Sequence, residues 1–215
     1  MKTLHRIALL ALASLFVACQ TTGADRAAAM VDSMRELQNR LNSGQEDITA
    51  AVDALQEVAK PGVDMRATFD RFTDAVDRLE QQSDRVKKLR QDIDRRRKGF
   101  VDAWEKQQAT ITNESLRERA AERRDEAVAA FEAINEIADE TRDVFDAWMV
   151  SVRDIRTYLD NDLNPAGVAN VTDVIEEVSE GAEPVLEQLE ELNALFDELN
   201  AALAAASPAP ASTDG

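Results

Sequence analysis

Cys19 is the only cysteine in the 215-residue sequence, and its neighbours indicate what its thiol can do. It follows an apolar run of eleven residues, Ile7 to Val17, and then the small residue Ala18. Lys2 and Arg6 precede that run. Positive residues, a short apolar stretch and a small residue before a cysteine are typical of a cleaved export signal whose cysteine is then acylated. We therefore expect Cys19 to be a lipid attachment site.

The apolar run is too short to remain in a membrane as a helix, because a spanning helix needs about 20 residues. We expect residues 1–18 to be removed as a lipoprotein signal peptide and residues 19–25 to form a polar tether. Gln20, rather than Asp, follows the cysteine, which favours the outer membrane, with the protein facing the periplasm of the bacterial cell envelope. The alternative is an ordinary secreted protein, in which Cys19 carries no lipid.

Cleavage would leave a chain with few reactive side chains. His5 is the only histidine and lies in the expected signal, so the mature chain has no histidine and no free thiol. Zinc sites use Cys and His ligands, and Ser or Cys nucleophiles usually need a His base. Pairs of carboxylates can do acid and base work, but with 42 acidic residues such pairs arise by chance on solvated helix faces. We predict no enzyme activity, no metal site and no cofactor.

Apolar residues recur every three or four positions along most of the chain, which is the spacing of a heptad repeat. The repeat occupies residues 30–58, 65–111, 120–159 and 171–203. Each segment would be amphipathic, so the helices must bury their apolar stripes against one another. The fold class that we expect is all-α, an elongated antiparallel helical bundle or coiled coil of about four long helices over residues 26–203.

Turn signals separate these segments. Lys60-Pro61-Gly62 ends the first segment, Ser115 and Glu118 have the spacing of a helix-capping box, and Asn164-Pro165 ends the third. Pro184 lies inside the fourth segment and predicts a kink there. Residues 204–215 are rich in Ala, Ser and Pro, and we expect a disordered tail.

The segment lengths predict a projecting end. If each helix folds back on the preceding one, residues 97–123 form a two-helix tip beyond the other helices, at the same end as Cys19. Trp104 and Trp148 fall on the apolar stripes, so we expect both rings to pack in the core rather than form a binding surface.

Charge is unevenly distributed. Without Lys2 and Arg6, 23 basic and 42 acidic residues remain, a net charge of −19, which argues against a nucleic-acid partner. A basic cluster nevertheless stands out in the second segment: Arg95, Arg96, Arg97 and Lys98. The fourth segment is acidic and has no basic residue. The basic cluster would either pair with the acidic segment or contact an anionic membrane surface or partner.

Several of these features occur together in one known family. They are the lipid-attachment motif (lipobox) at Cys19, the Lys60-Pro61-Gly62-Val63-Asp64 break before the Phe69 to Leu79 stripe, the segment from Phe100 to Trp104, and Leu116-Arg117 after a polar turn. In these features the chain resembles a family of uncharacterised bacterial envelope proteins with predicted long helical hairpins. The resemblance covers about residues 30–160. It implies a helical-hairpin fold and no particular activity.

Two classes of function follow from these observations. The first is a lipid-anchored helical rod that acts as a structural or protein-interaction component, a scaffold or spacer. The alternative is a lipid-handling or membrane-interacting helical module. The expected partners are the membrane, through the lipid anchor, and another envelope protein, and the sequence does not predict an oligomeric state.

The lipid anchor can be tested directly. The unchanged protein should incorporate a palmitate analogue in cells and fractionate with membranes, whereas Cys19→Ser should incorporate none, because only a thiol at this position accepts the lipid. Equal labelling of the two proteins, read by in-gel fluorescence, would contradict the assignment of Cys19.

Overall fold

The computed structural model describes residues 23–206, apart from the side chains of residues 23, 24, 27 and 200–206. The predicted signal peptide, Cys19 and most of the predicted tail lie outside the described residues. Six helices make up the described chain: α1 Gly23–Val58, α2 Met65–Gln108, α3 Glu114–Asn161, α4 Pro165–Ala169, α5 Thr172–Glu180 and α6 Glu183–Ala206.

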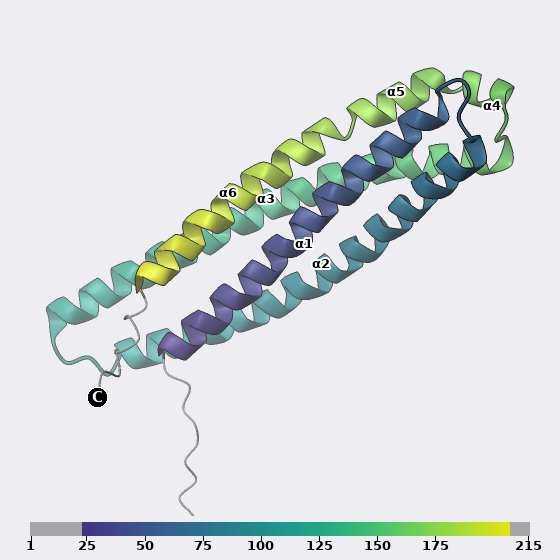
Figure 1. Ribbon diagram of the computed structural model, residues 1–215. Helices are drawn as coiled ribbons and strands as arrows, with labels where there is room; N and C mark the ends of the chain where they lie inside the picture. Colours follow the sequence, from purple (N-terminus) through teal and green to yellow (C-terminus); the bar gives the residue numbers. More distant parts are fainter. Residues whose placement is uncertain (1–22, 207–215) are drawn as a thin grey trace, which may run out of the picture.

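The helices form an elongated antiparallel bundle (Figure 1). α1 and α2 lie side by side as a hairpin, α3 runs back along the bundle, and α5 and α6 return along α3 and α1. With 44 residues, α2 is about 66 Å long at 1.5 Å per residue. The predicted all-α, antiparallel architecture is confirmed.

The core consists of two apolar clusters that follow one another along the bundle, with the partly buried Leu41 packed against both. Met34, Ile48 and Leu55 of α1 are buried at the predicted heptad positions, as are Phe72 and Leu79 of α2. The same pattern holds in the other half of the bundle, where α3 and the α5–α6 segment bury their own stripes: Phe131, Ile134, Trp148, Val152, Ile155, Ile175, Val178, Leu189, Leu192 and Phe196. Burial of one stripe per helix therefore holds the bundle together.

Polar side chains fix how α1 lies against α6. Gln38 donates a hydrogen bond from Nε2 to Oδ1 of Asp197 at 2.8 Å. Asn193 donates from Nδ2 to Oδ1 of Asn42, also at 2.8 Å. These bonds join residues more than 150 positions apart in the chain, so they specify the register of the two helices.

Local capping determines where α2 and α3 begin. The Asp64 side chain accepts from the Ala67 amide at 3.1 Å, directly after a turn in which Gly62 adopts a positive φ of 81°. Asn113 caps α3 by accepting from the Leu116 amide at 3.1 Å. The prediction of a capping box at Ser115 was therefore wrong, because Asn113 supplies the cap two residues earlier and Ser115 already lies in the helix.

The fourth segment is divided rather than kinked, which corrects the prediction for Pro184. α5 ends at Glu180, and Pro184 occupies the second position of α6, where its missing amide hydrogen would have had no helical acceptor. Trp148 of α3 is buried at this break and donates from Nε1 to the carbonyl of Val178 at 2.8 Å. The indole supplies a donor to a carbonyl in the last turn of α5, where the chain leaves the helix.

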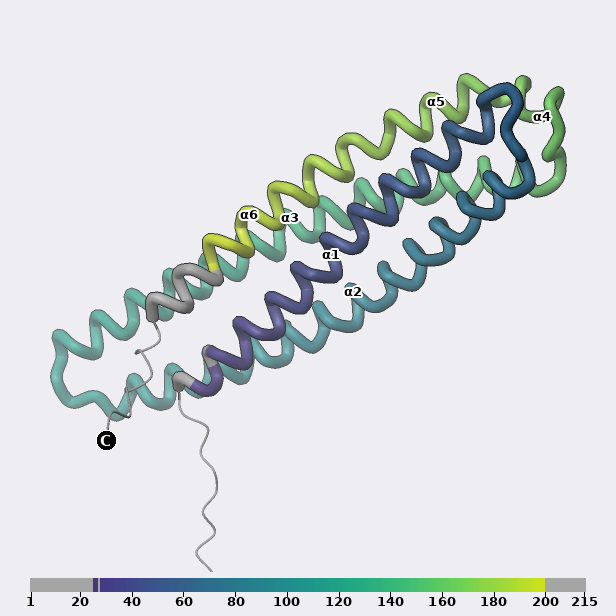
Figure 2. The backbone as a smooth tube through the Cα atoms, in the orientation of Figure 1, coloured from purple at the N-terminus to yellow at the C-terminus, as the bar shows by residue number. Residues whose placement is uncertain are grey.

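The α2–α3 tip projects past the ends of α1 and α6, as Figures 1 and 2 show. No described side chain between residues 97 and 123 is buried. Trp104 is half-buried and packs edge-on against Phe100 with the ring centroids 5.4 Å apart. The prediction of a core position is thus confirmed for Trp148 but not for Trp104, because the tip has no third helix to cover the ring.

The two ends of the bundle differ slightly from the predicted boundaries. α1 begins at Gly23, inside the segment predicted as a tether, and α6 continues to Ala206, inside the predicted tail. Cys19 is therefore only four residues from the first helix.

Because Phe72 is fully buried, Phe72→Ala should lower the free energy of unfolding by about 3–5 kcal/mol through lost apolar burial and the cavity left behind. Leu116→Ala is the control, since Leu116 is 58% exposed on the tip and should change stability by less than about 0.5 kcal/mol. Urea unfolding followed by circular dichroism measures both values. Similar losses in the free energy of unfolding for the two variants would mean that Phe72 does not lie in the core.

Candidate functional site

Cys19, the predicted lipid site, lies outside the described residues. α1 starts at Gly23 at the end of the bundle where the α2–α3 tip projects (Figure 1). None of the described helices has a stretch that is both long enough and apolar enough to cross a bilayer.

The basic cluster, Arg95 to Lys98, lies on α2 alongside the first turns of α1. Arg95 forms an ion pair with Asp92 of the same helix, and Arg97 reaches Asp94 at 4.0 Å. Arg96 and Lys98 are exposed and form no ion pair within the described residues. The cluster thus keeps two solvated cations near the start of α1.

The expected pairing between this cluster and the acidic fourth segment does not occur. In the described chain, no carboxylate of α5 or α6 forms an ion pair. Interhelical pairs instead join α1 to α2 and α2 to α3, as in Arg78 with Asp47 at 2.7 Å and Arg153 with Glu80 at 2.7 Å. The reason is geometric, since α5 and α6 pack against α1 and α3, whereas most cations lie on α2.

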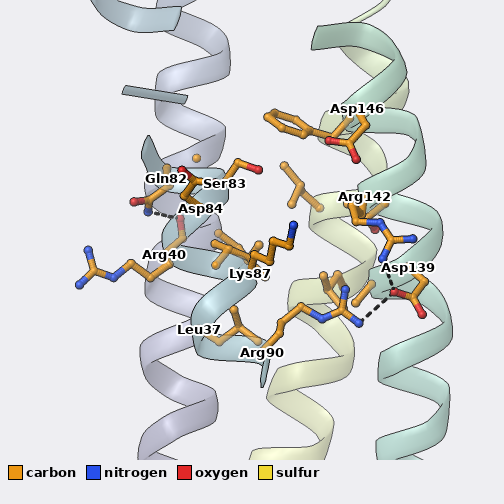
Figure 3. A pocket seen from close by; sticks show the side chains of 18 of the residues that line it. Leu37, Arg40, Gln82, Ser83, Asp84, Lys87, Arg90, Asp139, Arg142 and Asp146 are labelled. Carbon is orange, nitrogen blue, oxygen red and sulfur yellow. Dashed lines mark hydrogen bonds and ion pairs between the residues drawn. The ribbon is translucent and has the colours of Figure 1, made fainter. Parts of the chain in front are cut away.

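A groove that the sequence reasoning missed opens between α2 and α3 in the middle of the bundle (Figure 3). Its volume is about 810 Å³. α1, α2 and α6 contribute its apolar floor, which includes Ile48, Leu79 and Leu189. Gly44 and Ser83, which occupy heptad positions but have small side chains, line the groove. Small residues at these two heptad positions were the feature of the sequence from which the groove could have been predicted.

Cations converge on one end of the groove. Arg90 of α2 and Arg142 of α3 each contact Asp139 at 3.0 Å, and Lys87 extends into the gap between the two helices (Figure 3). A hydrogen bond to Asp143, together with the charges of that carboxylate and of Asp139, raises the pKa of Arg142 above its ordinary value. Arg142 is therefore cationic at neutral pH.

Within the described residues, no group of three or more His, Cys, Asp or Glu side chains is arranged to hold a metal ion. The groove combines an apolar floor with fixed charges at its rim and has no nucleophile paired with a base among its lining residues. Such a surface can hold a molecule.

A family model described as "Protein of unknown function (DUF2959)" matches residues 15–206. The chain belongs to this family. The match includes α4, α5 and α6 as well as the α2–α3 hairpin, so the whole bundle is what the family shares. No curated protein and no solved structure matches the chain. The family description names neither a location nor a lipid, so both stay predictions.

The location of the basic cluster leads to a test with anionic vesicles. A soluble Cys19→Ser protein should bind them in low salt, and the double change Arg96→Gln and Lys98→Gln should weaken binding about 30-fold, since each basic residue near such a surface contributes about 1 kcal/mol. Vesicle co-sedimentation measures the effect, and added salt should remove it.

The matched control is Lys60→Gln with Arg66→Gln, which removes the same charge from the opposite end of the bundle. Equal losses in the two double variants would show that net charge alone governs binding and that the cluster has no special role.

Proposed function

We propose that the protein is a lipid-anchored rod of the bacterial cell envelope that acts as a structural or protein-interaction component and catalyses no reaction. The observation that carries this proposal is the placement of the start of α1, four residues after Cys19, at one end of a long and narrow bundle (Figure 2). We place the anchor in the outer membrane, with the rod in the periplasm, because Gln20 follows Cys19.

The short connection to Cys19 would orient the rod. Four residues span at most about 14 Å when fully extended, so a lipid on Cys19 holds this end of the bundle close to the bilayer. The α2–α3 tip projects at the same end, and the solvated cations Arg96 and Lys98 lie nearby. The tip would therefore lie against the headgroups.

The opposite end would stand away from the membrane. α3 has 48 residues and spans about 72 Å, so the turns at that end lie at a distance comparable to the full length of the rod. Tyr158 and Val174 are exposed there, at 36% and 39%. An end that is distant from the anchor and partly apolar is suited to contact another envelope component.

Site-specific photocrosslinking in intact cells tests this function. A crosslinking residue at Val174, on the end away from Cys19, should give one discrete protein adduct. At Leu116, on the tip, it should react with lipid rather than protein. At Val150, which is 54% exposed on the side of the bundle, eleven residues before the end of α3, it should give no discrete adduct.

The adducts are separated by gel electrophoresis and identified by mass spectrometry. Because all three positions are exposed, differences between them reflect position along the rod rather than access. No adduct at Val174, or the same adduct at all three positions, would contradict a rod that presents its distal end to a partner.

A further inference from the structure

The groove between α2 and α3 is large enough for a small molecule. Its volume of about 810 Å³ lies within the range of about 300–1,000 Å³ that is usual for ligand sites. Its floor is made of apolar residues from α1, α2 and α6 that are almost fully buried: Ile48, Leu79, Val185, Leu189 and Leu192.

The amino-acid sequence creates this space. Gly44 of α1 and Ser83 of α2 occupy heptad positions at which the neighbouring turns carry Leu41, Ile48 and Leu79. A Cβ atom placed on Gly44 would meet no atom within 4 Å. Larger residues at these two positions would close the groove, so its volume follows from local side-chain size rather than from a poor fit between helices.

The charges at the rim are not symmetrical. Lys87, Arg90 and Arg142 gather at one end, where Arg90 and Arg142 contact Asp139 and Arg142 also contacts Asp143. Asp94 lines the groove as well, and its carboxylate pairs with Arg97. Lys87 has no ion-pair partner within the described residues and extends into the opening. Asp84 and Asp146 lie toward the other end (Figure 3). An anionic group is therefore favoured beside Lys87, the cation at this end that has no ion-pair partner within the described residues.

We propose that this groove binds one long-chain fatty acid, with the acyl chain on the apolar floor and the carboxylate beside Lys87, Arg90 and Arg142. The lining residues of α2 run from Leu79 to Asp94 and cover about 22 Å of helix. One acyl chain of a bilayer leaflet spans about 15 Å, half of the hydrocarbon core, so such a chain fits along the groove.

This ligand site is independent of the proposed rod function, because it depends neither on acylation of Cys19 nor on a partner at the distal end. The site gives Lys87 a chemical role and explains why position 44 is glycine. The anchored rod requires neither residue.

The test uses the full chain with Cys19→Ser, so that no attached lipid competes for the groove. A fluorescent 16-carbon fatty acid should bind with a stoichiometry of one per chain. Palmitate should displace it at least roughly tenfold more effectively than hexadecanol, which has the same chain without the charge.

Two pairs of variants locate the site. Gly44→Leu should abolish probe binding by filling the groove, and the thermal midpoint should be unchanged or raised, because leucine favours a helix more than glycine does. Gly99→Leu, an α2 glycine that also has open space around it but lies outside the groove, should bind like the unchanged protein. Lys87→Gln should remove most of the preference for palmitate over hexadecanol, whereas Lys88→Gln, on the exposed neighbour, should preserve it.

Absence of saturable probe binding, or binding that Gly44→Leu leaves intact, would overturn the proposal. If Gly44→Leu lowers the thermal midpoint, Ser83→Leu serves as the second groove-filling variant, and binding must be lost in it. Equal displacement by palmitate and hexadecanol would also overturn the proposal, because it would show that the cations at the rim do not recognise a carboxylate.

Discussion

Every part of this structure depends on the burial of one apolar stripe along each long helix. The helices have no disulfide to hold them, since the chain has a single cysteine. Exposed ion pairs such as Arg35 with Asp32 contribute little, because water and salt screen them. Apolar burial is therefore the dominant stabilising term, and it fixes the antiparallel arrangement of α1, α2, α3 and the α5–α6 segment.

This dependence explains which features could be predicted from the sequence. Heptad spacing alone is enough to predict the fold class and most core residues, because the spacing is visible within each segment without knowledge of which segments pack together. The cap of α3 was misplaced, since Asn113 and Ser115 are both good capping residues and only the backbone geometry distinguishes them. The break before Pro184 was predicted as a kink because the Trp148 indole that stabilises it comes from a distant part of the chain.

The candidate sites were predicted unevenly for a similar reason. Arg95 to Lys98 were evident as a run of like charges, but their partners proved to be local, at Asp92 and Asp94. The groove was not predicted, because it requires Gly44, Ser83 and residues of α3 and α6 to meet at one level of the bundle. The acidic residues of α5 and α6 remain solvated. Together with the net charge of −17, they favour solubility and disfavour tight association with other acidic surfaces.

The order of the helices has a kinetic consequence. α1 pairs with α2, its neighbour in the chain, and α3 pairs with α5 and α6, which follow it directly. Each half of the bundle is therefore a local hairpin whose ends meet after closure of a short loop, and chains with such low contact order fold quickly. The interface between the two halves, α2 with α3 and α1 with α5 and α6, forms when the hairpins dock. The groove lies on that interface, which means that its width is governed by hairpin docking rather than by the stability of any single helix.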